Sequence, residues 1–209
     1  MKHSSIVKFF DVVETKSHLC ILMEWIPGGE LFQYVTVRGK LSECETKIIM
    51  KQLLLVVDFL HAHGVVHRDL KLENVIVDSR FHDPVSIKLI DFGLARTFKS
   101  NQLLSTRCGS EEYAAPEIIR GDLYDGRKSD VWSLGIIMYA CLFGALPFNP
   151  ESNRPKALYE KICRTFYKIP NNIASPEAVD LIRRILIANP EERPTIQDIL
   201  SSEWILSAS

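Results

Sequence analysis

The sequence has no long run of apolar residues, and this absence limits what the chain can be. The nearest candidate, residues 136–146, is broken by Gly144 and is shorter than the roughly 18 residues that a membrane-crossing helix needs. The N-terminus lacks the basic and then apolar pattern of a secretory signal. An excess of one charge is also missing, because 25 Lys and Arg residues face 26 Asp and Glu residues. The composition therefore predicts neither a membrane nor a nucleic acid as partner.

Cysteine is present, but not in a metal-binding or disulfide-forming pattern. The five cysteines are odd in number and scattered, and no CxxC pair occurs. Reduced thiols in the cytoplasm or the nucleus fit this distribution better than a disulfide framework.

Glycine is absent before Gly28. The remaining composition, 46% hydrophobic and 24% charged, is typical of a globular chain with one domain or two small ones.

Local patterns predict two strands followed mostly by helices. Residues 7–14 and 19–25 are rich in β-branched and apolar side chains, and Pro27-Gly28-Gly29 then breaks the pattern. Ser42 and Glu45 have the spacing of a capping box, which predicts a helix from there to about residue 62. The other predicted elements are strands at 75–78 and 87–90 and helices at 30–37, 129–143, 175–186 and 195–204.

Three motifs carry the chemistry: His67-Arg68-Asp69-Leu70-Lys71-Leu72-Glu73-Asn74, Asp91-Phe92-Gly93 and Ala115-Pro116-Glu117. They supply a base, a cation for a phosphate and two oxygen ligands for a metal, as phosphoryl transfer from ATP to a hydroxyl requires. In order and spacing the motifs resemble those of protein kinases, and the resemblance covers essentially all 209 residues. It implies an α+β, protein-kinase-like fold, in which a mostly helical large lobe follows the hinge and the last strands of the small lobe.

Within this family, residues 23–32 and 124–135 are similar to the calcium/calmodulin-dependent group. The Gly-rich loop, the strand lysine and the αC helix of the small lobe have no counterpart in the sequence. The resemblance therefore implies a partial domain, in which residues 1–26 are a small-lobe remnant with the hinge and 27–206 the large lobe. We expect a serine/threonine protein kinase that is N-terminally truncated and weakly active alone; the alternative is a pseudokinase or scaffold that binds protein partners.

The resemblance also implies a role for each polar residue of the motifs. Asp69 would orient the substrate hydroxyl or accept its proton, and Lys71 would neutralise charge on the transferred phosphoryl group. Asn74 and Asp91 would hold Mg²⁺, which prefers oxygen ligands. The implied cofactors are therefore ATP and Mg²⁺. Lys71 also favours serine or threonine over tyrosine as the acceptor.

The adenine is expected at the hinge, where it would pair with the backbone of Glu24 and Ile26. Met23 would close the back of the pocket and Ile76 would form its floor; both could at the same time be plain core residues. Glu30 would contact the ribose or a basic substrate residue, and Glu73 is similarly ambiguous. The implied nucleotide-binding residues are Met23, Glu24, Ile26, Glu30, Glu73, Asn74, Ile76 and Asp91.

Other family features would support the site rather than act in it. Asp130 is expected to cap the backbone of the catalytic loop, and His67 to pack under Phe92. Glu117 and Arg193 match a buried ion pair of the family. The three histidines at 61, 63 and 67 are too loosely spaced to favour a metal site.

The segment between Gly93 and Ala115 is expected to carry regulation and substrate recognition. Thr106 is the predicted activating phosphosite, with Ser105 as the competing site, and Arg68 and Arg96 would pair with the added phosphate. The predicted partners are protein substrates with a basic residue upstream of the acceptor, read by Glu30. The predicted substrate-binding residues are Glu30, Ser110 and Glu111, the last two facing the residue after the acceptor in a polar pocket.

Overall fold

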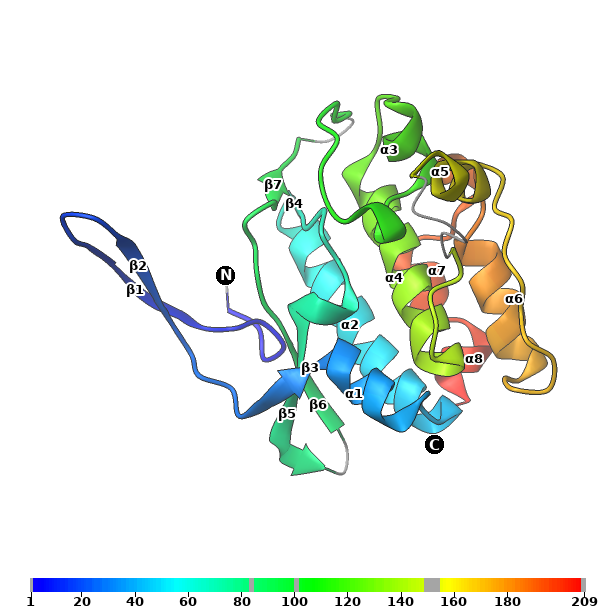
Figure 1. Cartoon of the computed structure of the whole chain (residues 1–209), viewed down its shortest axis with the longest axis horizontal. Coiled ribbons are helices and arrows are strands. Elements are labelled where there is room, and N and C mark those ends of the chain that lie inside the picture. The colour runs from blue at the N-terminus through cyan, green and yellow to red at the C-terminus, as the bar shows by residue number, and fades with distance from the viewer. Residues whose placement is uncertain (1, 83–84, 100–101, 149–154, 208–209) are drawn as a thin grey trace.

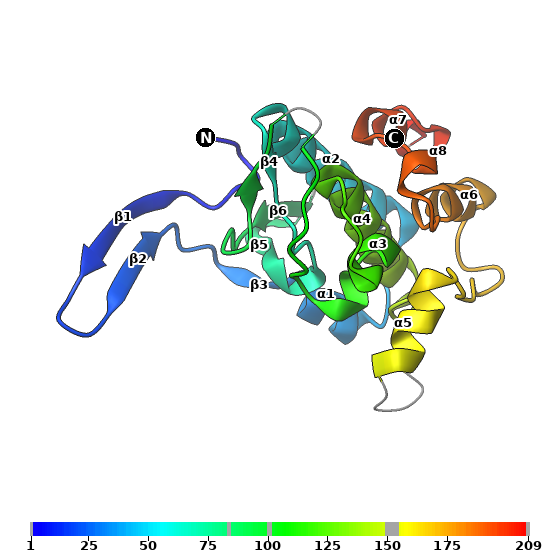
Figure 2. The same cartoon turned by 90° about the horizontal axis from the view of Figure 1, so that it is seen from above.

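A computed structural model describes residues 2–82, 85–99, 102–148 and 155–207. In Figures 1 and 2 a mostly helical body carries a β-hairpin that extends away from it near the N-terminus. The described strands form one three-stranded sheet, β3-β5-β6, and two two-stranded sheets, β1-β2 and β4-β7. The predicted α+β class is therefore confirmed. No helix within the described ranges has both the length and the apolar character to cross a membrane.

The extended hairpin consists of β1 (Phe9–Glu14) and β2 (Leu19–Met23), which pair antiparallel. Thr15 closes its turn, because its N–H donates to the His18 carbonyl at 2.8 Å. The two strands predicted at 7–14 and 19–25 are thus confirmed, and each is two residues shorter than expected. The apolar side chains of the hairpin are exposed, including Phe10 at 62% and Ile21 at 57%.

The central sheet joins β3 (Gly28–Glu30), β5 (Val75–His82) and β6 (Val85–Leu89). β2 ends before the break expected at Pro27-Gly28-Gly29, but Gly28–Glu30 then forms a strand that the sequence did not predict and pairs with β5. Gly28 has φ 148°, and a Cβ there would lie only 2.0 Å from the Val77 carbonyl oxygen. Glycine is therefore required at Gly28 by the close approach of two backbones, not only by a turn.

The first helices are α1 (Leu31–Arg38) and α2 (Glu43–Ala62), close to the predicted ranges. Ser42 caps α2 as expected, because its Oγ accepts from Glu45 N at 3.2 Å. The reciprocal half of the capping box is not formed. Instead, the Glu45 carboxylate accepts from the Tyr34 hydroxyl at 2.6 Å and ties α1 to α2.

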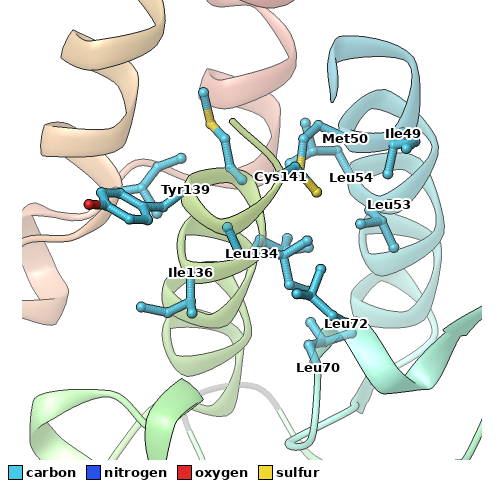
Figure 3. Packing of buried hydrophobic residues seen from close by; sticks show 14 of the residues in the cluster. Ile49, Met50, Leu53, Leu54, Leu70, Leu72, Leu134, Ile136, Tyr139 and Cys141 are labelled. Atoms are coloured by element: carbon cyan, nitrogen blue, oxygen red, sulfur yellow. The ribbon is translucent and has the colours of Figure 1, made fainter. Parts of the chain in front are cut away.

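The main core lies between α2 and α4 (Gly126–Phe143). Figure 3 shows Leu53 and Leu54 of α2 among the side chains that pack with Leu134 and Cys141 of α4. These four side chains are fully buried. Asp125 caps α4 through Arg127 N, so the helix begins three residues before the predicted Ser129. Because α4 is buried nearly all round, it forms a rigid base for the loop that precedes Asn74.

Several short elements complete the body, and sequence patterns predicted few of them. The helix predicted at 195–204 is instead two helices, because a turn at Ser201 and Ser202 separates α7 (Ile196–Leu200) from α8 (Glu203–Leu206). The helix predicted at 175–186 is confirmed as α6, capped by Ser175. The remaining elements are β4 (Val65–Val66), β7 (Arg96–Thr97), α3 (Pro116–Arg120), α5 (Pro155–Cys163), α6 (Pro176–Ile185) and the 3₁₀ turns Leu72–Asn74, Glu111–Tyr113 and Pro190–Glu192.

Candidate active site

The candidate site begins with a loop held in place by one carboxylate of α4. Asp130 accepts from His67 N and Arg68 N, each at 2.9 Å, and from His61 Nε2 at 2.8 Å. Arg68 has φ 67°, a conformation that costs energy in a residue other than glycine. The two backbone hydrogen bonds compensate for this strain. The predicted capping role of Asp130 is therefore confirmed.

The loop brings three of the predicted polar residues together. Asp69 Oδ2 lies 3.1 Å from Lys71 Nζ and 3.1 Å from Asn74 Nδ2. Asn74 Nδ2 also donates to the Asp69 carbonyl at 2.8 Å, so the amide faces Asp69 with its nitrogen. The loop thus positions a carboxylate, an ammonium group and an amide within hydrogen-bonding distance.

Ser110 completes this cluster from the following segment. Its N–H and its hydroxyl lie 3.1 and 3.2 Å from Asp69 Oδ1, and Lys71 Nζ lies 3.0 Å from the same hydroxyl. Gly109 allows the approach, because a Cβ there would lie 2.6 Å from the Arg68 carbonyl oxygen. The structure therefore places Ser110 directly against the two expected catalytic residues.

The surroundings of Asp69 favour its ionised form. Partial burial alone would raise the pKa of the carboxyl, but hydrogen bonds and charge attraction from Lys71 and donors from Ser110 outweigh that effect. The pKa of Asp69 is therefore below its usual value, and the group is a carboxylate at neutral pH.

Asp91 follows β6 by two residues, and a backbone hydrogen bond of the residue before it holds it near the catalytic loop. Ile90 N donates to the Asn74 carbonyl at 2.9 Å, which fixes the end of the strand against the loop. Asp91 has φ 57°, is exposed, and accepts from Gly93 N through Oδ1 at 3.0 Å. Asn74 Oδ1 and Asp91 Oδ2 have no hydrogen-bond partner within the described part of the chain. Two such oxygens fit Mg²⁺, which keeps most of its ligands from water or phosphate.

His67 packs against Phe92 as expected, with ring centroids 5.1 Å apart at 60°. Burial lowers the pKa of His67, so the ring is neutral at neutral pH. Its Nδ1 lies 3.3 Å from Asp69 N.

Among the residues that the structure covers, no three His, Cys, Asp or Glu side chains form a metal-binding group. The histidines at 61, 63 and 67 are thus not gathered as metal ligands.

The hinge residues lie where the hairpin returns to the body. Met23 ends β2 and is 50% exposed, so the alternative reading of it as a core residue is wrong. Ile76 is partly buried on β5. The Glu24 side chain accepts from Lys88 Nζ at 2.9 Å, a contact that sequence reasoning missed. The adenine-pairing role of Glu24 and Ile26 stays a prediction.

The two acidic residues with ambiguous roles lie in different surroundings. Glu30 lines a pocket of about 310 Å³ between α1 and the central sheet, together with Tyr34 and Val77. Glu73 Oε2 lies 3.4 Å from the Tyr113 hydroxyl. The expected contacts of Glu30 and Glu73 with nucleotide or substrate stay predictions.

The predicted regulatory residues lie around the start of the catalytic loop. Arg96 pairs with Val66 in β7 and β4, and Arg68 Nε donates to the Leu94 carbonyl at 2.7 Å. Arg68 Nη1 is buried, and no residue in the described ranges hydrogen-bonds to it. Thr106 is exposed, and its carbonyl accepts from the Tyr124 hydroxyl at 2.9 Å.

The predicted substrate-binding residue Glu111 contacts a helix that the sequence did not predict. Its carboxylate accepts from the Tyr159 hydroxyl of α5 and lies 3.4 Å from Arg107 Nη2. The Arg107 guanidinium lies 4.9 Å from the centre of the Tyr159 ring. The surface beside Ser110 is therefore polar, as expected.

Comparison with known proteins identifies the family. The protein kinase domain model matches residues 1–205, and the chain therefore belongs to the protein kinase domain family. One curated relative is the carbon catabolite-derepressing protein kinase of Candida tropicalis, 42% identical over 204 residues. The match covers 98% of this chain and 32% of that protein, so the chain spans about a third of the relative's length.

Proposed function

We propose that the chain transfers the γ-phosphoryl group of ATP to serine or threonine hydroxyls of proteins. The observation that carries this proposal is the cluster in which Asp69, Lys71, Asn74 and Ser110 share hydrogen bonds. Asp69, Lys71 and Asn74 keep the groups that the reaction needs. Family membership agrees with the proposal, and so does the name of the curated relative, a protein kinase.

Each residue would take one part in the phosphoryl transfer. Asp69, ionised at neutral pH, would accept a hydrogen bond from the acceptor hydroxyl and take its proton. Lys71 Nζ lies 3.0 Å from the Ser110 hydroxyl. Its charge would attract the oxygens of the phosphoryl group that is being transferred to the acceptor hydroxyl. Asn74 Oδ1 and Asp91 would hold Mg²⁺, which supplies charge neutralisation for the phosphates.

Substrate choice and regulation extend the proposal. Glu30, at the start of α1, would read a basic residue upstream of the acceptor, and Glu111 would favour a polar residue after it. Phosphorylation of Thr106 would activate the site through Arg68 and Arg96. Arg68 Nη1 is buried and has no hydrogen-bond partner among the described residues, which supports this role because such a donor favours an incoming anion.

The test is phosphoryl transfer from γ-labelled ATP, with Mg²⁺, to a serine peptide that has an upstream arginine. Asp69→Asn should lower the rate at least about 100-fold, since a general base contributes on that scale. Asp122→Asn, the same change at an exposed aspartate, serves as the matched control. The rate of the chain alone should lie below the roughly 1–100 s⁻¹ of typical kinases, because its sequence has no Gly-rich loop. Transfer that is equal in the original chain and in Asp69→Asn would contradict the proposal.

A further inference from the structure

A buried ion pair connects the hinge to the strand that leads to Asp91. Lys88 Nζ of β6 lies 2.9 Å from Glu24 Oε2, and the two side chains are 11% and 15% exposed. The same oxygen accepts from Lys8 N at 3.1 Å, while Glu24 N donates to the Lys8 carbonyl at 2.8 Å. Lysine and glutamate are seldom buried unless they are paired. The pair therefore fixes Glu24 to the central sheet.

β6 is hydrogen-bonded along both edges, so it holds Lys88 in a fixed position. Val7 N donates to the Leu89 carbonyl at 3.1 Å, and Leu89 N donates to the Ser5 carbonyl at 2.8 Å. On its other edge, Lys88 pairs with Ile76 of β5. Paired residues of antiparallel strands point to the same face, so Lys88 shares a face with the residue expected under the adenine.

The chain that follows Lys88 leads to the proposed metal ligands, because Asp91 is only three residues further on. Ile90 N donates to the Asn74 carbonyl at 2.9 Å, and Asp91 follows directly. One short stretch of chain thus joins the hinge to both oxygen ligands. Because ATP must reach from the hinge to these ligands, their relative position affects how well the whole nucleotide fits.

We propose that Lys88 is a positioning residue that sets the hinge backbone at Glu24 against Ile76, its partner on β5, so that affinity for the adenosine part of ATP depends on it. The inference rests on the proposed function only in taking a nucleotide as the ligand. Lys88 acts through Glu24, whose pKa is lowered first of all by the Lys88 hydrogen bond. Glu24 is therefore a carboxylate at neutral pH.

The experiment compares binding of adenosine and of Mg²⁺·ATP by calorimetry. Lys88→Met should weaken both about tenfold, the effect of losing one charge-assisted hydrogen bond, and Lys88→Arg should restore most of the affinity. Lys8→Met is the matched control, because Lys8 contacts Glu24 through its backbone, and it should bind like the original chain. Asp91→Asn should weaken Mg²⁺·ATP but leave adenosine unchanged.

A second variant separates positioning from loss of folding. The double change Lys88→Met with Glu24→Met removes the pair without leaving a buried charge, so thermal stability should largely recover while adenosine binding stays weak. Unchanged adenosine affinity in Lys88→Met, or full recovery in the double variant, would overturn the inference. An original chain that binds both ligands but transfers no phosphoryl group would contradict the proposed function alone.

Discussion

Arg193 and Glu117 form a bidentate ion pair, in which Nη1 and Nη2 each lie 2.7 Å from a separate carboxylate oxygen. The guanidinium also donates to the carbonyls of Ile187 and Ala188 and lies 4.9 Å from the ring centre of Trp132. The pair joins α3, at the end of the segment that carries Ser110, to the turn before α7. This confirms the ion pair expected from the sequence.

Breaking this pair from one side is predicted to destabilise the chain strongly. Glu117→Gln and Arg193→Met should each lower the free energy of unfolding by about 3–5 kcal/mol, because each leaves a buried group unpaired. Glu117→Met combined with Arg193→Met should cost less than the sum of the single changes. Urea denaturation measures all three. A loss below about 1 kcal/mol in both single variants would show that the pair is not stabilising in this way.

Stability is predicted to fall in acid through Glu43. Partial burial would raise the pKa of this carboxyl, but its hydrogen bonds from Ser175 and Trp204 outweigh that effect and hold the pKa below its usual value. The ionised form therefore stabilises the fold above the unfolded pKa, and this contribution disappears as pH falls through the folded pKa. Thermal denaturation at about pH 7 and pH 3.5 should show a smaller difference in Glu43→Gln than in the original chain. An identical difference in both would refute this assignment.

The sequence predicted the parts of the site that depend on neighbouring residues. Asp69, Lys71 and Asn74 lie on one loop, so their spacing nearly determines their proximity. Ser42 is another local signal, because a cap needs only the following turn. The hydrogen bonds of the structure show this proximity and confirm the Ser42 cap, while the roles of the three loop residues stay predictions.

Contacts between distant segments left no comparable signal. Lys88 and Glu24 are 64 residues apart, and nothing at either position indicates the other. Gly28 was read as a break because glycine commonly ends strands, whereas the approach of β5 requires it. α7 and α8 are separated at Ser202, whose backbone is extended where the sequence pattern suggested a continuous helix. Tertiary packing decides such cases, not local preference.

Phosphorylation of Thr106 is predicted to raise activity at least about tenfold, since charge-assisted hydrogen bonds to arginine would order the segment. Thr106→Ala should abolish the gain, while Ser105→Ala should retain it. Arg96→Gln should reduce the gain without changing the unphosphorylated rate. Peptide phosphorylation before and after treatment with an activating kinase, with the modified residue located by mass spectrometry, measures each effect. A full gain in Thr106→Ala would exclude this site.

The exposed hairpin is predicted to make the chain associate. β2 has no charged residue between Leu19 and Met23, and its apolar side chains are open to solvent, with Ile21 at 57% exposure. An uncharged, apolar edge strand readily pairs with another copy. Ile21→Lys should therefore shift the chain toward monomer in sedimentation velocity, because a charge on the strand opposes pairing. Leu55→Lys, a matched change at an exposed leucine of α2, should leave association unchanged. A monomeric original chain at tens of micromolar, or an equal effect of both substitutions, would show that the hairpin edge does not drive association.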